Sequence, residues 1–174
     1  MLPDPLHPSI VHFPIALSIL VPLAALAALV AARRRPDLGR TLWVVVLALA
    51  VLLVGASWVA LETGEQQEER VEEIVSERPL ESHADRAQIF LVISWITLGL
   101  AAVGLARGGV GRSGRALATL AALTLIPAGI RVGHSGGELV YRHGAANAYQ
   151  SGNGARISSV GGEKRRAIEG KDVE

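Results

Sequence analysis

The sequence predicts an all-α integral membrane protein: a four-helix bundle with an acidic helical segment outside the membrane and a flexible C-terminal tail. Half of the 174 residues are apolar and the mean hydropathy is +0.37, which is high for a water-soluble domain of this length. The apolar residues form four runs of membrane-spanning length, with the charged residues gathered between them. The predicted transmembrane domain is residues 1–147, and residues 148–174 form the tail.

The first two spans are predicted at about residues 10–32 and 41–62. The first run contains no charged residue and stops at Arg33–Arg35. It is longer than the apolar core of a signal peptide and lacks a cleavage-like end, so we expect it to be retained. The second run carries Trp43 near one end and Trp58 near the other, which is typical of helices anchored at both membrane–water boundaries.

The third and fourth spans are predicted at about residues 84–106 and 115–134. The third run follows Ser82 and Asp85, whose spacing suits the start of a helix. The fourth contains Pro127, which lacks a backbone N–H and is expected to kink the helix.

The segment between the second and third spans is acidic and is expected to be helical. It holds nine acidic residues between Glu62 and Asp85. Apolar side chains at Val71, Ile74 and Val75 recur at helical spacing among glutamates. The second helix therefore continues beyond the bilayer or restarts as a surface helix, and Pro79 is expected to end it.

The distribution of charge predicts the orientation. The connections at residues 33–40 and 107–115 hold seven arginines and one acid, so both are expected in the cytoplasm. The acidic segment and the first nine residues, which lack Lys and Arg, are expected outside. Four spans then give an N-out/C-out protein with the lipid bilayer as its surroundings. In a bacterial inner membrane, both termini would be periplasmic.

Composition excludes several functional classes. The chain has no cysteine, and therefore no disulfide, thiolate zinc site, iron–sulfur cluster or covalently attached haem. Its formal charge of +1 does not indicate the basic surface of a nucleic-acid-binding protein. The oligomeric state is not predicted from the sequence. No nucleophile elbow, P-loop, dinucleotide fingerprint or zinc-protease motif occurs, so an enzymatic activity beyond electron transfer is not expected.

The five histidines all fall toward the outer side in this topology. His7 and His12 lie at the start of the first span, His83 at the start of the third, and His134 and His143 at the end of the fourth. Two interpretations stay open. The histidines mark the membrane interface, or several converge to bind haem b or a transition-metal ion.

Helical spacing limits which histidines can act together. His7 and His12 are separated by about 140° around a helix, and His12, one turn further in, is the better candidate to face the bundle. His134 and His143 lie on opposite faces of an ideal helix, unless Gly136–Gly137 bends the chain between them.

A polar stripe lies at the outer end of the fourth span. Arg131, His134, Glu138 and Tyr141 share one helical face, which is expected to face protein or a water-filled cavity. Arg131 either extends its charge to the membrane surface, pairs with Glu62 at the matching end of the second span, or meets haem propionates.

Two motifs resemble a known family. His7–Ile15 has the sequence HPSIVHFPI, and Gly133–Gly144 has the sequence GHSGGELVYRHG. In both motifs, and over about residues 5–147, the chain is similar to a bacterial four-span membrane family catalogued as domain of unknown function 2231 (DUF2231). The family has no established activity. Some members are joined to cytochrome-like domains, and the resemblance therefore favours a redox or haem setting. The positions that match the family pattern are His7, His12, His134 and His143, with His83 at the polar entry to the third span.

Two functions are weighed from the sequence. The first is a small b-type cytochrome-like electron carrier, with haem b between His12 or His83 and a histidine of the fourth span, and with a periplasmic or membrane redox partner. The alternative is a non-redox module: a structural subunit, a metal-binding protein or a transport-associated protein, with a transition-metal ion or no cofactor. Candidate haem-binding residues are His12, His83, His134, His143 and Arg131; candidate metal ligands are His7, His12, His83, His134 and His143; further polar candidates are Glu62, Glu138 and Tyr141.

Overall fold

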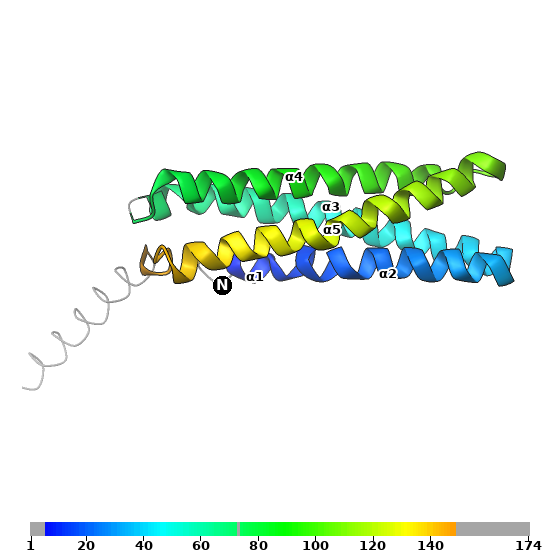
Figure 1. Cartoon of the computed structure of the whole chain (residues 1–174), viewed down its shortest axis with the longest axis horizontal. Coiled ribbons are helices and arrows are strands. Elements are labelled where there is room, and N and C mark those ends of the chain that lie inside the picture. Colours follow the sequence, from blue (N-terminus) through cyan, green and yellow to red (C-terminus); the bar gives the residue numbers. More distant parts are fainter. Residues whose placement is uncertain (1–5, 73, 149–174) are drawn as a thin grey trace, which may run out of the picture.

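The computed structural model of the chain describes residues 6–72 and 74–148. This part contains five helices and no strand (Figure 1). The predicted tail lies, from residue 149 onward, outside the described residues. In chain order the helices are α1 (His7–Ile10), α2 (His12–Arg34), α3 (Pro36–Glu72), α4 (Glu77–Val103) and α5 (Gly108–Tyr141).

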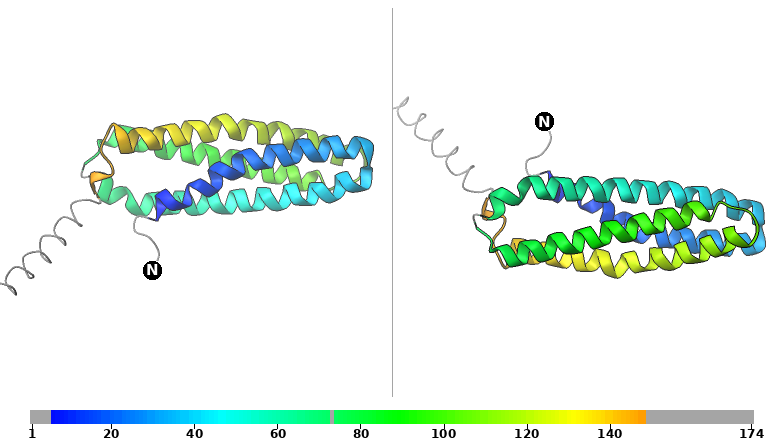
Figure 2. Two further views of the ribbon diagram at one scale, coloured as in Figure 1. Left: turned by 90° about the horizontal axis from the view of Figure 1, so that it is seen from below. Right: turned by 90° about the horizontal axis from the view of Figure 1, so that it is seen from above.

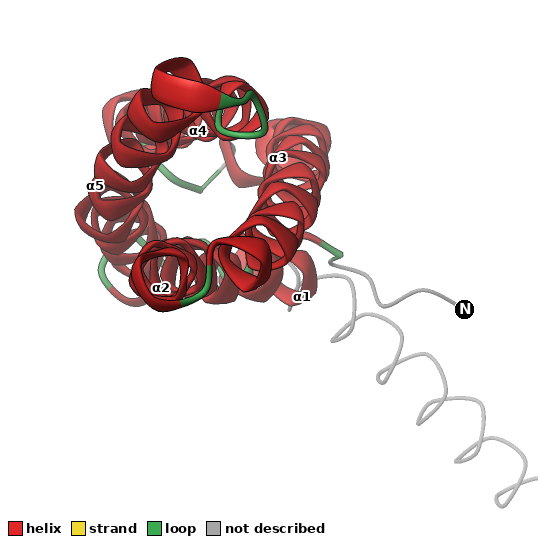
Figure 3. Ribbon diagram, turned by 90° about the vertical axis from the view of Figure 1, so that its right-hand side faces the viewer, coloured by secondary structure: helices red, strands yellow, loops and turns green. Residues whose placement is uncertain are grey.

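Helices α2 to α5 form an antiparallel bundle in which each helix packs against two neighbours. Contacts join α2 to α3, α3 to α4, α4 to α5 and α5 back to α2, and the view along the bundle in Figure 3 shows this ring. The short helix α1 packs against α3. Four helical segments are long and apolar enough to cross a membrane: His7–Arg34, Asp37–Glu68, Glu77–Val103 and Gly108–Tyr141. The predicted all-α membrane bundle with four spans is confirmed.

The two ends of the bundle differ in charge. At one end, here called the basic end, lie the arginine-rich turns from α2 to α3 and from α4 to α5. At the other, the acidic end, lie α1, the connection from α3 to α4 and the end of α5 (Figure 2). All five histidines belong to the half of the bundle near the acidic end.

The break between α1 and α2 has a local cause. Pro14 has no N–H to donate to the carbonyl of Ile10, and its ring crowds that carbonyl, so the helix is interrupted at Val11. The break lets α1 lean toward α3 while α2 follows the bundle axis (Figure 2). As a result, His7 and His12 belong to different helices.

The acidic segment between the second and third spans is helical over most of its length, as predicted, and the second helix continues into it. α3 continues past residue 62 to Glu72, and α4 begins at Glu77 instead of residue 84. The expectation that Pro79 ends a helix is wrong, because Pro79 lies in the first turn of α4, where no intrahelical N–H bond is required. An apolar cluster closes the acidic end and stabilises both extensions. Its buried members are Val71, Val75, Leu139 and Ala145.

α5 is also longer than predicted. It begins at Gly108 and continues through Pro127 and Gly136–Gly137 to Tyr141, and it runs obliquely across the other helices in Figure 1. The bend at Gly136–Gly137 that the sequence allowed is not formed.

The centre of the bundle is packed with small residues around a few large ones. Trp43 is 0% exposed and donates its Nε1–H to the carbonyl of Ala101 at 2.9 Å, so the expectation that it marks a membrane boundary is wrong. Trp58 and Trp95 instead lie on the outer surface of the bundle, with 55% and 50% of their surface exposed. The cluster around Trp43 contains Ala25, Ala28, Val46, Ala101 and Ala118, and a second cluster contains Val21, Leu53, Phe90, Ala122 and Leu125.

Candidate functional site

The acidic end brings two of the five histidines together. His7 from α1 and His83 from α4 lie with their ring centroids 6.4 Å apart, and the ring planes are nearly perpendicular, at 87°. Both side chains are half-buried. The sequence placed both histidines at the outer side and among the candidate metal ligands, but it did not single them out as a pair.

The His7 ring is held by the end of the second span. Its Nδ1 lies 2.8 Å from the carbonyl oxygen of Ala60 and 3.4 Å from Oγ1 of Thr63. A carbonyl oxygen only accepts hydrogen bonds, so Nδ1 carries the hydrogen and donates it to Ala60. In the neutral imidazole, Nε2 therefore keeps a free lone pair.

The His83 ring is held in the same tautomer by α5. The hydroxyl of Ser135 donates its hydrogen to the carbonyl of Val132 at 2.9 Å. Ser135 Oγ must then accept from Nδ1–H of His83, which lies 2.9 Å away. The Nε2 lone pair of His83 is left available, as it is in His7.

A glycine leaves room for each ring. A Cβ atom added at Gly64 would lie 3.2 Å from Cε1 of His7, and one added at Gly136 would lie 3.2 Å from Cε1 of His83. Both distances are shorter than ordinary van der Waals contact, so a larger residue would displace the imidazole. Gly136 therefore leaves space for the His83 ring, and α5 continues through it without a break.

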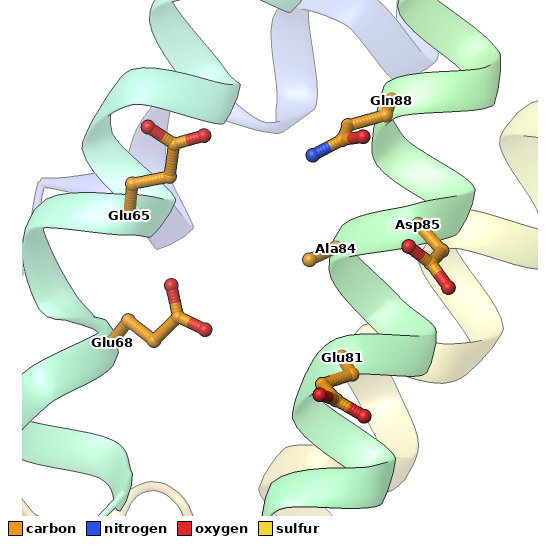
Figure 4. A pocket seen from close by; sticks show the side chains of 6 residues that line it. All are labelled: Glu65, Glu68, Glu81, Ala84, Asp85 and Gln88. Atoms are coloured by element: carbon orange, nitrogen blue, oxygen red, sulfur yellow. The ribbon is translucent and has the colours of Figure 1, made fainter.

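An acidic cleft opens between α3 and α4, at the same end of the bundle as the histidine pair. Its volume is about 490 Å³. Glu65 directly follows Gly64, and Asp85 comes two residues after His83, but neither His7 nor His83 lines the cleft. Figure 4 shows Glu68 and Gln88 pointing into the space between the two helices. The lining is completed by Glu81 and Ala84.

The other predicted histidines do not join this pair. His12, His134 and His143 are exposed. The expectation that His12 rather than His7 faces the bundle is wrong, because the break at Val11 turns His7 toward α3 and leaves His12 on the outer face of α2. The ligand roles predicted for these exposed histidines stay predictions.

The polar stripe of α5 faces outward. Arg131 and Tyr141 are exposed, and Glu138 accepts a hydrogen bond from Arg142 at 2.8 Å and lies 3.7 Å from Nε2 of His134. Arg131 does not pair with Glu62, whose Oε1 lies 3.5 Å from the amide nitrogen of Gln66. The stripe therefore does not line an internal cavity of the bundle.

His7 and His83 have few potential metal ligands around them among the described residues. Within residues 6–72 and 74–148, no three His, Cys, Asp or Glu side chains come together in a way that could hold a metal ion. His7 and His83 thus offer two nitrogen donors, and further ligands would have to come from water or from a bound molecule. The residues that sequence reasoning missed are the ones that hold the rings: Ala60, Thr63, Gly64 and Ser135.

Comparison with known proteins gives one match. A family model described as predicted membrane protein (DUF2231) matches residues 3–149. No curated protein and no solved structure matches the chain.

Proposed function

This chain belongs to the DUF2231 family of predicted membrane proteins, and we propose that it binds a transition-metal ion at the acidic end of the bundle. The Nε2 atoms of His7 and His83 are the ligands in this proposal. The observation that carries it is the engagement of both Nδ1–H groups, by Ala60 and by Ser135. Metal-binding histidines characteristically donate their second ring N–H to such a carbonyl or polar side chain, which fixes the ring and its tautomer.

The ring spacing supports a shared ion. Two imidazoles that bind one metal at about 2.0–2.1 Å have ring centroids about 5–6.5 Å apart, depending on the angle at the metal. The observed 6.4 Å falls at the long end of this range. Imidazole nitrogens suit zinc, copper, nickel and iron. With only two protein donors, the site is open and exchangeable, as expected for a module that handles a metal rather than one that needs it to fold.

The acidic cleft favours a cation. Four carboxylates line it, from Glu65, Glu68, Glu81 and Asp85. Clefts lined by one sign of charge raise the local concentration of the opposite ion. The cleft would therefore supply metal ions to the histidine pair.

Haem b is the second candidate, and it rests on the same two rings. Axial imidazoles on opposite faces of a haem also have their centroids about 6 Å apart. The acidic cleft is the reason to prefer the ion, because its carboxylates, at the same end of the bundle, would repel haem propionates.

The test is metal binding by the detergent-purified chain. After equilibrium dialysis against Zn²⁺ or Cu²⁺ at pH 7, one ion per chain is expected. His7→Ala and His83→Ala should each abolish stoichiometric binding. The matched control, His12→Ala with His134→Ala, removes two exposed histidines and should leave binding intact.

Two results would contradict the ion site. Binding that survives both His7→Ala and His83→Ala would assign the metal to other residues. A Soret band in protein expressed with ample haem, lost in either variant, would establish the haem candidate instead.

We also propose that the acidic end faces the periplasm of a bacterial inner membrane, so that the protein is N-out/C-out. The arginine-rich turns at the basic end support this orientation. Alkaline phosphatase fused after Glu174 should be active, and the same reporter inserted in the turn between α2 and α3 should be inactive. The reverse pattern would overturn the orientation.

A further inference from the structure

A second feature lies on the opposite side of the bundle from the α3–α4 cleft. An apolar groove of about 200 Å³ runs between α2 and α5 in the half near the acidic end. Ile15 and Ile19 of α2 and Ile126 and Ile130 of α5 form its walls. Three of these isoleucines are largely exposed, so the groove opens on the surface that faces lipid.

Small residues create the groove. Ser18, Gly129 and Gly133 lie along it where α2 and α5 approach. A Cβ added at Gly129 would lie 3.1 Å from Oγ of Ser18, so this glycine sets the close approach of the two helices. A Cβ added at Gly133 would meet nothing within 4 Å, so the space above Gly133 is the groove itself.

The size and lining select an elongated apolar occupant. Pockets for small-molecule ligands begin at about 300 Å³. A groove of about 200 Å³ with almost purely apolar walls is too small for a ring-shaped cofactor and suits one hydrocarbon chain. In a bilayer, such chains are supplied by phospholipids.

An exposed arginine, Arg131, lies one helical turn before His134, a residue that lines the groove. Glu138 is neutralised by Arg142 at 2.8 Å, and it lies 3.7 Å from His134, which lines the mouth. Arg131 follows Ile130 of the groove wall, is exposed, and has no ion-pair partner in the described part of the chain. An arginine near the outer end of a membrane-spanning helix extends its side chain toward the membrane surface, where lipid phosphates lie.

We propose that the groove holds one anionic phospholipid, with an acyl chain between α2 and α5 and its phosphate at the Arg131 guanidinium. The site is separate from the histidine pair, and it does not depend on metal binding. His134 lies beside the headgroup at the mouth.

The test is the lipid that the chain retains. Full-length protein is reconstituted with equal amounts of phosphatidylglycerol and phosphatidylethanolamine, returned to detergent, washed, and examined by native mass spectrometry. One phosphatidylglycerol per chain is expected. Gly133→Leu fills the groove and should remove the lipid, whereas Gly99→Leu, at an exposed glycine of α4 with equally open surroundings, should retain it.

A charge variant tests the headgroup. Arg131→Gln should lower phosphatidylglycerol retention about fivefold and remove the preference over phosphatidylethanolamine. Arg112→Gln, an exposed arginine of α5 at the basic end, should change neither. Retention of no phospholipid, equal retention of the two lipids by the unmodified chain, or a quinone in place of phospholipid would overturn the proposal.

Discussion

Replacing Trp43 with alanine is expected to lower the free energy of unfolding by about 3 kcal/mol, because a buried tryptophan leaves a large cavity. The indole is 0% exposed, in a cluster whose other buried members are four alanines and one valine. Lipid is as apolar as the core, so the loss comes from van der Waals contacts and from the hydrogen bond to Ala101, rather than from transfer out of water.

Two neighbours of Trp43, Arg115 and Gly104, allow a second test of how the indole is packed. Arg115 donates from Nε to the carbonyl of Gly104 at 2.7 Å, and its guanidinium lies 5.8 Å from the centre of the indole ring. A Cβ at Gly104 would overlap the indole directly. Gly104→Ala should therefore destabilise the unmodified protein, and should do so much less in the Trp43→Ala background, where the space is free.

Unfolding in mixed detergent micelles measures these effects. Trp95→Ala is the matched control, since Trp95 is 50% exposed in the middle of α4. It should change stability by much less than Trp43→Ala. Equal losses in the two variants, or strictly additive effects of Trp43→Ala and Gly104→Ala, would contradict the packing described for the basic end.

The number and order of the helices were predictable because they follow from simple local patterns. Apolar runs of membrane length, separated by arginines or glutamates, leave few alternatives to a bundle of four spans. The ends of the helices were less predictable. Val71 and Val75 are buried only because Leu139 and Ala145, distant in sequence, close the acidic end, and these contacts extend α3 and α4 beyond the predicted limits.

The location of the histidines at one end was predictable, but their partners were not. Which histidines meet depends on the rotation of each helix about its axis and on the break before Pro14. A uniform helix over residues 7–34 would keep His12 as the inner candidate. The structure instead pairs His7 with His83, because α1 leans toward α3 and Gly64 and Gly136 leave room for the two rings.

The sequence also could not distinguish the buried tryptophan from the exposed one. Trp43 and Trp58 both lie near the ends of an apolar run, as boundary residues do. What distinguishes them is a set of small residues on the neighbouring elements, above all Gly104 at the end of α4, which leaves the space that the Trp43 indole fills. Such pairs of a large residue and a glycine on different helices are invisible in one sequence.

Ser135→Ala is expected to weaken metal binding about 10- to 100-fold, the usual effect of removing a hydrogen-bond partner behind a ligating histidine. The Ser135 hydroxyl is the acceptor that keeps hydrogen on Nδ1 of His83. Without it, the ring loses its fixed orientation, and its hydrogen can move to Nε2, the proposed ligand atom. Metal affinity is measured by competition with a chromophoric chelator.

Ser94→Ala separates this effect from a general loss of packing. Ser94 is a fully buried serine of α4 whose hydroxyl donates to the carbonyl of Phe90 rather than to a histidine. It should leave metal affinity unchanged. The ¹⁵N chemical shifts of His83 give an independent readout: Nε2 should be unprotonated in the metal-free protein and in Ser94→Ala, and partly protonated in Ser135→Ala. If Ser135→Ala binds metal as tightly as Ser94→Ala, the hydroxyl does not position the ligand, and the tautomer argument for His83 fails.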